Sequence, residues 1–331
     1  MKIAVIGRTA YAILLKKYLR KEFIVKHFDS LHDNRLNEFK EAEVLVSMTW
    51  GKSIWGENMK KKIPDLKKLK LIHLPGSGTD GIDFSLVPLG CIVCNVYEHE
   101  IAISEYVLAN LLNWEIKLFN KVNKFKHYNW EDSMLFSNHP HSELNKKNIG
   151  ILGYGRIGKE IAKKLKVFNT KTTAITRKKI KKDTFFQNNI LVKDLTKNLK
   201  EYDYLIIACD LNKSTLDLIT KKEISRMKKK SVIVNVARGP IVNEKDLYLA
   251  LKNNKIGGAI IDTWYKYPEK ENKKYFKPSK FDFTKLSNIV MTPHLSALTE
   301  SLLERRIKII SKNIVAIREN KKLINVVNSE G

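Results

Sequence analysis

The chain has 331 residues, of which 43% are hydrophobic, so it is long enough for about two domains with substantial cores. Its 61 Lys and Arg residues exceed its 35 Asp and Glu residues, giving a net charge of +26, and three cysteines argue against a disulfide framework. No run approaches the ~20 apolar residues of a membrane span, and no signal-peptide pattern precedes the first strand-like residues, so we expect a cytoplasmic protein.

Residues 1–98 alternate between strand-like and helix-like segments, which predicts a parallel sheet covered by helices. The segment Tyr11–Lys21 has the pattern of a helix. The expected strands are short apolar runs between polar stretches: Lys2–Ile6, Phe23–Lys26, Glu43–Ser47, Lys70–Leu74 and Cys91–Asn95. The first strand ends at Gly7 without the further glycines of a nucleotide turn, so we expect no cofactor site there.

A glycine-rich loop, Pro75–Asp83, follows the fourth of these strands. Ligands of α/β proteins bind at the carboxyl ends of strands, and N–H groups at Ser77 and Gly78 could hold a carboxylate. A plain turn fits this stretch equally well. Cys91 and Cys94 form a C-x-x-C pair, but residues three apart on a strand face opposite sides, so we expect no metal site.

A long helical pattern, Glu100–Phe125, leads to a second alternating series. A helix is expected at Asn243–Asn253, and a last helix near Leu298–Ile317 is expected to return to the first domain. The expected strands of the second series are Ile149–Leu152, Thr172–Thr176, Tyr204–Cys209, Val232–Val236, Gly258–Asp262 and Ile289–Met291. The pattern therefore predicts two α/β domains with parallel sheets.

The segment Asn148–Gly158 carries one G-x-G-x-x-G motif, at Gly153, Gly155 and Gly158, between an apolar strand and a helix. In dinucleotide-binding turns the first glycine allows a tight turn, the second lets the pyrophosphate approach, and the third lets helix and strand pack closely. The helix N-terminus then offers free N–H groups and a positive dipole end. A lone motif is weak evidence, but its strand–turn–helix setting predicts dinucleotide binding.

Three polar residues, Arg238, Asp262 and His294, follow apolar strands at what should be one edge of the second sheet. Oxidoreduction of a hydroxy acid needs a cation for the carboxylate, which Arg can bind through two parallel hydrogen bonds. It also needs a group that exchanges a proton near neutral pH, which suits His. Taken singly, each residue has an alternative explanation: a surface arginine, a capping aspartate and a structural histidine.

At these residues the chain resembles the D-2-hydroxyacid dehydrogenase family, over nearly its full length. The matching segments are L-K-L-I-H-L-P-G-S-G-T-D-G-I-D, I-S-E-Y-V-L-A-N-L-L, I-G-I-L-G-Y-G-R-I-G-K-E-I-A, V-I-V-N-V-A-R-G-P-I-V-N-E, G-A-I-I-D-T-W and T-P-H-L-S-A. The resemblance implies two Rossmann-like, doubly wound domains: a flavodoxin-like substrate domain of residues 1–100 plus 296–331, and a dinucleotide-binding domain of residues 101–295. It also implies a homodimer built through the nucleotide-binding domains.

The resemblance further implies roles for single residues. Arg238 would bind the substrate carboxylate and carbonyl, with Ser77 and Gly78 also holding the carboxylate, and His294 would be the acid/base. Asp262 would contact the nicotinamide carboxamide. The implied cofactor-binding positions are Gly153, Tyr154, Gly155, Arg156, Ile157, Gly158, Thr176, Arg177, Lys178, Cys209, Thr215, Val236, Ala237, Asp262 and His294.

Tyr267 is a departure from the family pattern, which usually has a Glu five residues after the Asp. That Glu pairs with the catalytic His and raises its pKa, because an opposite charge favours the imidazolium. Tyr267, which we include among the candidate catalytic residues, can orient His294 by a hydrogen bond but supplies no charge near pH 7. Formate dehydrogenases of the superfamily also lack the Glu, and their reaction needs no proton relay.

The end of the second strand of the nucleotide-binding series bears on the choice of cofactor. NAD-binding turns usually carry Asp or Glu about 20 residues after the glycines, where it binds the ribose hydroxyls and repels a 2′-phosphate. Here Thr176 ends the strand, and Arg177, Lys178 and Lys179 follow. Arg177 can stack on adenine or bind the phosphate. We predict NADP(H) in preference to NAD(H); the alternative is a solvated basic run in a lysine-rich chain.

Our leading hypothesis is an oxidoreductase that transfers a hydride between NADP(H), or NAD(H), and a small 2-oxo or 2-hydroxy acid such as glyoxylate or hydroxypyruvate. The alternatives are a dehydrogenase of a hydride donor such as formate or phosphite, and a non-catalytic dinucleotide-sensing protein. Retention of Arg238 and His294 disfavours the sensor. The lysines lie in scattered short clusters without a basic arm or zinc finger, so we expect a small-molecule substrate and neither a nucleic-acid nor a membrane partner.

Overall fold

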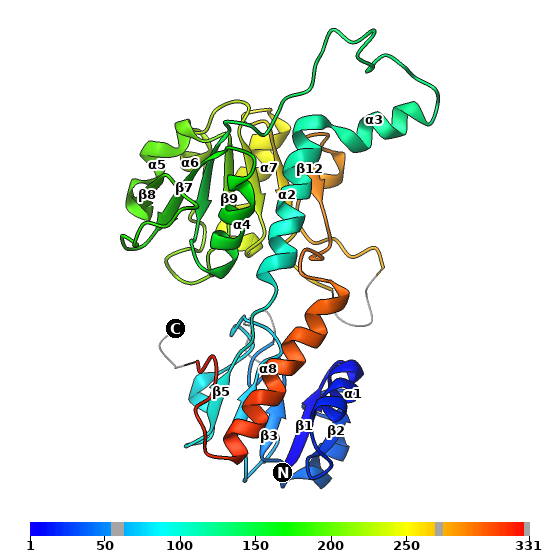
Figure 1. Cartoon of the computed structure of the whole chain (residues 1–331), viewed down its shortest axis with the longest axis vertical. Helices are drawn as coiled ribbons and strands as arrows, with labels where there is room; N and C mark the ends of the chain where they lie inside the picture. Colours follow the sequence, from blue (N-terminus) through cyan, green and yellow to red (C-terminus); the bar gives the residue numbers. More distant parts are fainter. Residues whose placement is uncertain (54–62, 269–273, 328–331) are drawn as a thin grey trace. The chain divides into compact units, whose positions relative to one another are not determined.

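The structure is a computed structural model that describes residues 1–53, 63–268 and 274–327 (Figure 1). The lysine cluster at 60–62 lies outside the described residues. The chain divides into two compact units, Met1–Glu98 with Thr299–Gly331 and His99–Leu298. Each unit contains one parallel sheet, of five and seven strands respectively, which confirms the predicted α/β fold with two doubly wound domains.

The first unit has the strand order β2-β1-β3-β4-β5, which is the flavodoxin-like order. Its strands are short and mostly buried: β1 Lys2–Ile6, β2 Ile24–Phe28, β3 Val44–Val46, β4 Leu71–His73 and β5 Ile92–Cys94. Its helical elements are α1 Thr9–Tyr18, the 3₁₀ helices η1 Asn34–Phe39 and η2 Phe84–Leu86, and α8 Glu300–Arg318. Because α8 buries Ile307, Ile310 and Ile314 in the core shared with α1 and the sheet, the C-terminal helix belongs to this unit.

The two nearby cysteines face different cores of the first unit. Cys94 lies in the core with α1 and α8, whereas Cys91 packs against the core on the other side of the sheet. Both thiols are free, and burial raises the pKa of each to about 12. Within the described ranges, no cluster of three or more His, Cys, Asp or Glu side chains is arranged to hold a metal ion.

The second unit has the strand order β12-β11-β10-β9-β6-β7-β8. Its strands are β6 Asn148–Leu152, β7 Lys171–Thr176, β8 Asn188–Leu191, β9 Tyr204–Ile207, β10 Val232–Asn235, β11 Gly258–Ile261 and β12 Ile289–Met291. Its α-helices are α2 Glu100–Ile116, α3 Leu118–Phe125, α4 Arg156–Lys166, α5 Leu195–Asn198, α6 Lys221–Ile224 and α7 Glu244–Lys252. Strand order reverses between β6 and β9, and ligands of such sheets bind at this switch point, beyond the carboxyl ends of the strands.

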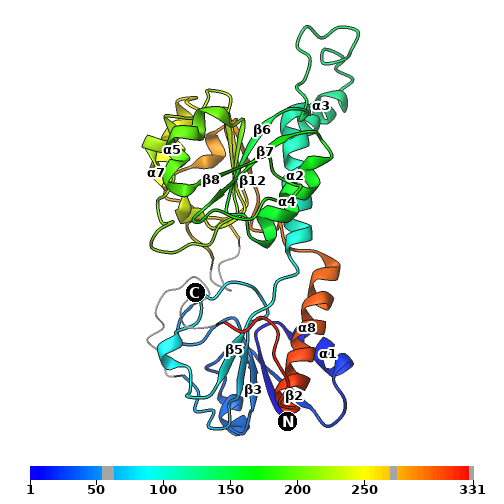
Figure 2. The ribbon, with the colours of Figure 1, turned by 60° about the vertical axis from the view of Figure 1, so that its left-hand side comes forward.

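Helices cover both faces of the second sheet. Figure 2 shows α2 and α4 on one face and α5 and α7 on the other, and a separate apolar core lies on each side. The strands of the centre, such as β9 and β10, are buried along their whole length, as expected for a parallel sheet. No helix among the described residues combines the length and apolar character needed to cross a bilayer.

Two features of the second unit differ from the sequence prediction. Strand β8 was not predicted, because it is a partly exposed edge strand that begins with two asparagines and lacks an apolar run. The predicted helix Glu100–Phe125 is broken at Lys117, which adopts a left-handed conformation with φ 58°. The Asn113 side chain accepts a hydrogen bond from the Phe119 N–H, so a local side-chain contact replaces the regular helical pattern there.

Candidate active site

The three glycines of the turn after β6 are in different surroundings. Gly153 has φ 94°, and a Cβ there would lie 2.6 Å from the backbone nitrogen of Cys209. A Cβ at Gly158 would lie 2.1 Å from the carbonyl oxygen of Gly153, so helix α4 packs closely on the turn. A Cβ at Gly155, by contrast, would meet no atom within 4 Å. The turn is therefore closely packed at its first and third glycines and open at the second.

Helix α4 begins at Arg156 directly after this open position. Its N-cap is Gly155, which has no side chain to bond the free N–H groups of the first turn. Arg156 is exposed, and its guanidinium lies 4.0 Å from the carboxylate of Glu100. Ile157 is half-buried, and the Tyr154 hydroxyl donates to the carboxylate of Asp183 at 3.1 Å. The free N–H groups and the positive dipole end at this helix start suit an anion such as a pyrophosphate.

The segment after β7 brings cations to the same edge. The Thr176 hydroxyl donates to the carbonyl oxygen of Lys178 at 2.7 Å and accepts from the Asn189 amide at 2.8 Å. Arg177 and Lys178 are exposed. Burial raises the pKa of the Cys209 thiol to about 12, and the charge of Arg177 opposes that rise, so the guanidinium lies within electrostatic reach of the end of β9.

The remaining predicted cofactor positions line the ends of β9 and β10 with buried side chains. Thr215 closes its loop, because its hydroxyl donates to the Asp210 carbonyl oxygen at 2.7 Å and accepts from the Asn212 N–H at 2.8 Å. Val236 and Ala237 are buried directly after β10. The predicted cofactor contacts of these three residues stay predictions.

Arg238 is half-buried at the end of the β10 segment. Its guanidinium donates to the Ala237 carbonyl oxygen at 2.8 Å, and the Asn235 amide donates to the Arg238 carbonyl oxygen at 2.9 Å. A Cβ at Gly239 would lie 2.5 Å from the backbone of Trp264, so the loop after β10 packs directly on the loop after β11. These contacts fix the backbone from which the guanidinium extends.

Asp262 organises the loop that carries His294. Its side chain has no exposed surface, and its carboxylate accepts hydrogen bonds from the Thr292 hydroxyl at 2.6 Å, the Leu295 N–H at 2.8 Å and the Ser296 N–H at 3.0 Å. His294 lies between these donors and has φ 55°. Burial lowers the pKa of His294; the charge of Asp262 raises it, and the charge of Arg238 lowers it.

Tyr267 lies against His294, with ring centroids 5.5 Å apart and ring planes at 52°. Its hydroxyl accepts a hydrogen bond from the Trp264 N–H at 3.0 Å. Burial raises the pKa of Tyr267, so the phenol is uncharged near pH 7. The two rings are in contact, and the uncharged phenol adds no negative charge beside the imidazole; the predicted orienting hydrogen bond from Tyr267 stays a prediction.

One protein family matches the second unit over most of its length. Residues 108–296 match the family model described as D-isomer specific 2-hydroxyacid dehydrogenase, NAD binding domain. This chain belongs to the D-isomer specific 2-hydroxyacid dehydrogenase family. The family resemblance predicted from the sequence is confirmed, and the matched domain is one that binds a nicotinamide dinucleotide.

Relatives of this dehydrogenase-family chain include several archaeal enzymes. It is 30% identical over 295 residues to a D-3-phosphoglycerate dehydrogenase from Methanocaldococcus jannaschii, covering 88% of this chain and 53% of that protein. It is 33% identical over 184 residues to a glyoxylate reductase from Pyrococcus horikoshii, covering 56% of this chain and 52% of that protein. The chain thus spans about half the length of these curated relatives. A solved structure of a family protein from Aeromonas salmonicida has a TM-score of 0.81 at 22% identity, covering 99% and 98%.

Two predicted substrate residues lie in the first unit of this family member. Ser77 and Gly78 are half-buried in the loop after β4. The Ser77 carbonyl oxygen accepts a hydrogen bond from the Asn95 amide at 2.9 Å, and Arg306 of α8 donates to the Pro75 carbonyl oxygen at 3.2 Å. The loop is therefore anchored from within its own unit, and its predicted role in binding a carboxylate stays a prediction.

Sequence analysis missed two polar residues that support the site. The Asn235 side chain bonds the Ala237 N–H at 3.1 Å and the Thr263 hydroxyl at 3.3 Å, and Thr292 donates to Asp262. The sequence signal for Asn235 was a lone polar residue in the apolar run V-I-V-N-V. Thr292 begins the segment T-P-H-L-S-A, but no neighbouring residue in the sequence indicates that its hydroxyl bonds to Asp262.

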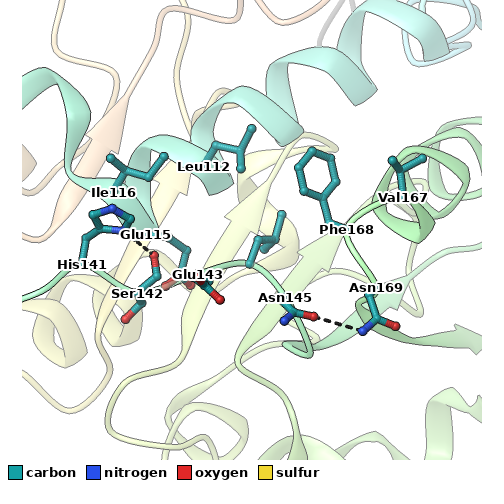
Figure 3. Close-up of a pocket in the computed structure, with 11 residues that line it drawn as sticks. Leu112, Glu115, Ile116, His141, Ser142, Glu143, Asn145, Val167, Phe168 and Asn169 are labelled. Carbon is teal, nitrogen blue, oxygen red and sulfur yellow. Dashed lines mark hydrogen bonds between the residues drawn. The ribbon is translucent and has the colours of Figure 1, made fainter.

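A pocket of about 400 Å³ lies elsewhere in the second unit. Figure 3 shows Leu112 and Ile116 of α2, His141, and Phe168 along its wall. Its walls come from segments that precede β6 and β7, so it lies at the amino ends of the strands. The candidate catalytic residues follow the carboxyl ends of the strands, so this pocket is separate from the candidate site.

Proposed function

We propose that this chain is an NAD(P)H-dependent reductase of small 2-oxo acids such as glyoxylate or hydroxypyruvate. The observation that carries the proposal is that Arg238 and the Asp262-anchored His294 follow β10 and β12, at the same sheet edge as the open glycine turn. The similarity to a glyoxylate reductase supports the substrate class. We also propose that the His99–Leu298 unit binds the dinucleotide and that Ser77 and Gly78 take part in binding the substrate carboxylate.

The chemistry assigns a distinct task to each side chain. A reduced nicotinamide dinucleotide held at the glycine turn and the start of α4 would supply the hydride that C2 of the substrate accepts. Arg238 binds the carboxylate and holds the carbonyl group in place, because a guanidinium forms two parallel bonds to such a group. His294 in its protonated form donates a proton to the carbonyl oxygen, which becomes the 2-hydroxyl group. Asp262 keeps His294 in position, and Tyr267 packs against the imidazole ring.

The fit of a dinucleotide rests on the open second glycine and the uncapped start of α4. We expect Gly155→Ala to leave the melting temperature almost unchanged and to weaken NADPH binding, because the new methyl group fills the space needed by the pyrophosphate. We expect Gly158→Ala to lower the melting temperature, because its methyl group meets the Gly153 carbonyl oxygen. Thermal unfolding measures the melting temperatures of both variants, and titration with NADPH measures their affinities. Equal melting temperatures would contradict the conclusion that Gly158 is closely packed and Gly155 is not.

The activity is tested by mixing the purified protein with NADPH or NADH and a panel of 2-oxo acids, and by following the nicotinamide absorbance near 340 nm. Glyoxylate and hydroxypyruvate are expected to be reduced. The panel includes 3-phosphohydroxypyruvate, because a D-3-phosphoglycerate dehydrogenase is among the relatives. A protein that binds NADPH but oxidises it with none of these acids would contradict the proposal.

A second candidate function is oxidation of a hydride donor such as formate or phosphite. It is favoured by Tyr267, which stands where the family usually has Glu, and by the burial that lowers the pKa of His294. Such a reaction needs no imidazolium. Reduction of NADP⁺ or NAD⁺ by formate or phosphite, without activity on 2-oxo acids, would establish this candidate and exclude the first.

Tyr267 gives a prediction for the pH dependence of reduction. Since reduction requires protonated His294 and burial lowers its pKa, kcat/KM should fall as the pH rises through a value below the ordinary histidine pKa. Tyr267→Glu should move this limb upward by about one pH unit or more, because a carboxylate beside the ring stabilises the imidazolium. Tyr267→Phe is the control and should leave the limb in place. An unchanged limb in an active Tyr267→Glu variant would show that residue 267 does not act on His294.

We propose that the chain forms a homodimer through the second unit. Figures 1 and 2 show α3 and the segment after it extending from that unit. Large apolar side chains are exposed along them: Leu118, Phe119, Val122, Phe125, Tyr128, Trp130, Met134, Leu135 and Phe136. Apolar patches of this kind mark protein–protein contacts. The cytoplasmic location stays a prediction.

Light scattering tests the homodimer directly. The wild-type protein at micromolar concentration should have the mass of two chains, and Phe119→Lys combined with Phe136→Lys should convert it to a monomer. Leu89→Lys, at a fully exposed position of the first unit, is the matched control and should remain dimeric. A monomeric wild-type mass would refute the homodimer.

A further inference from the structure

Tyr106 of helix α2 is the start of a hydrogen-bond chain that reaches the loop of His294. Its hydroxyl oxygen lies 2.7 Å from the Thr292 hydroxyl oxygen, which lies 2.6 Å from the Asp262 carboxylate. The Thr292 hydroxyl donates its single proton to the Asp262 carboxylate, so it accepts the hydrogen bond from the Tyr106 hydroxyl. Burial raises the pKa of Tyr106 to about 12, so it keeps the proton that it donates throughout the neutral range.

The hydrogen-bond chain from Tyr106 to Asp262 matters because His294 is held in an unfavourable backbone conformation. A residue with a Cβ rarely adopts φ 55°, so the surrounding contacts have to maintain it. Asp262 bonds Thr292 on one side of His294 and Leu295 and Ser296 on the other. The Thr292 carbonyl oxygen also accepts from the Trp264 indole N–H at 2.8 Å. Thr292 thus joins Tyr106 of α2 to this loop.

We propose that Tyr106 is a positioning residue for His294, acting through Thr292 and Asp262, and that removal of the Tyr106 or the Thr292 hydroxyl weakens the support of His294. This inference rests on the proposed reductase function. Asp262, Arg238 and Tyr267 are titratable or charged side chains that face His294, and Tyr106 reaches the loop of His294 through its contact with Thr292. The competing explanation is that Tyr106 only packs its ring against the core that α2 covers.

Kinetics of three variants separate these explanations. Tyr106→Phe keeps the ring and removes the hydroxyl, and Thr292→Val removes the next hydroxyl. Each should lower kcat for a 2-oxo acid by about tenfold, the effect of one well-placed hydrogen bond, with less than about a twofold change in the dissociation constant of NADPH. The double variant should be no slower than Thr292→Val alone, because both changes break the same chain. Thr292→Ser, which keeps the hydroxyl, should restore most of the rate.

Tyr202→Phe is the matched control, because Tyr202 is buried in the other core of the same unit, where its hydroxyl bonds Thr173. It should retain wild-type kcat. Wild-type kcat in Tyr106→Phe, or losses that multiply in the double variant, would overturn the proposal while leaving the reductase function intact.

An NMR titration tests the same hydrogen-bond chain without enzyme turnover. A protein that shows no reductase activity can therefore still confirm or overturn the positioning role of Tyr106. The imidazole signal of His294 is assigned with His294→Ala and titrated in each variant. Because burial is the largest cause of the lowered pKa of His294, loosening its loop in Tyr106→Phe or Thr292→Val should raise that pKa toward the ordinary value. Tyr202→Phe should leave it in place. A His294 pKa unchanged in both test variants would overturn the proposal.

Discussion

Replacing Arg238 with alanine should lower kcat/KM for 2-oxo acids by about 10³-fold, the largest effect expected of any single substitution in this chain. The guanidinium is the cation placed at the end of β10, and Asn235 and the close packing at Gly239 fix the backbone that carries it. A charge-assisted pair of hydrogen bonds to the substrate carboxylate is lost in the variant. Because Arg238 is half-buried and outside the apolar cores, the melting temperature should change little.

Two further observations separate a role in substrate binding from a general disturbance. Arg238→Lys keeps the charge but not the planar fork, so it should recover only part of the lost activity. The charge of Arg238 lowers the pKa of His294, so the pH limb of the residual activity in Arg238→Ala should move upward. An Arg238→Ala enzyme with nearly normal kcat/KM would remove the central substrate contact of the proposal.

The second large effect is expected at the cofactor. We propose that the chain prefers NADPH, because Thr176 ends β7 and the exposed Arg177 and Lys178 follow it. In the combined variant Thr176→Asp and Arg177→Ala, a carboxylate repels the 2′-phosphate and the guanidinium that would bind it is gone. The ratio of kcat/KM for NADPH to that for NADH should fall by about 10²-fold. The Asn189 amide, which now donates to the Thr176 hydroxyl, can donate to the new carboxylate, so the fold should tolerate the change.

A control addresses the alternative that this segment is only a solvated basic run. Lys181 is exposed a few residues further along the same run, and Lys181→Ala removes the same amount of charge as Arg177→Ala. It should leave the cofactor ratio almost unchanged at physiological ionic strength, where exposed charges are screened. A wild type that prefers NADH, or a combined variant whose ratio does not move, would contradict the preference.

Residues whose role depends on local sequence were the ones that could be predicted. The glycine turn follows from spacing within Asn148–Gly158, and the ends of apolar strands placed Arg238, Asp262 and His294 at one edge of a parallel sheet. The NADP(H) preference, which rests on Thr176 and the cations that follow it in sequence, stays a prediction. In each case a few adjacent residues carry the physical signal.

Contacts between distant segments could not be predicted in this way. Nothing near Tyr106 indicates that its hydroxyl meets Thr292, 186 residues further along the chain. The three hydrogen bonds that Asp262 accepts depend on how the loop after β12 folds back on β11. Strand β8 depends on the neighbouring β7 for its pairing, because its own sequence is polar and partly exposed. The reactive groups of the site can therefore be predicted from local sequence. The hydrogen bonds that hold these groups in place depend on tertiary structure and cannot.

The most direct test of the account is transfer of a deuteride from deuterated NADPH, labelled at the reactive position of the nicotinamide ring, to hydroxypyruvate. The proposed reductase should give a 2-hydroxy acid product with one deuterium at C2, in the D configuration for which the family is specific, and Arg238→Ala should lose that product. Oxidation of NADPH without deuterium at C2, or a protein that binds NADPH and yields no labelled product from any 2-oxo acid, would contradict it.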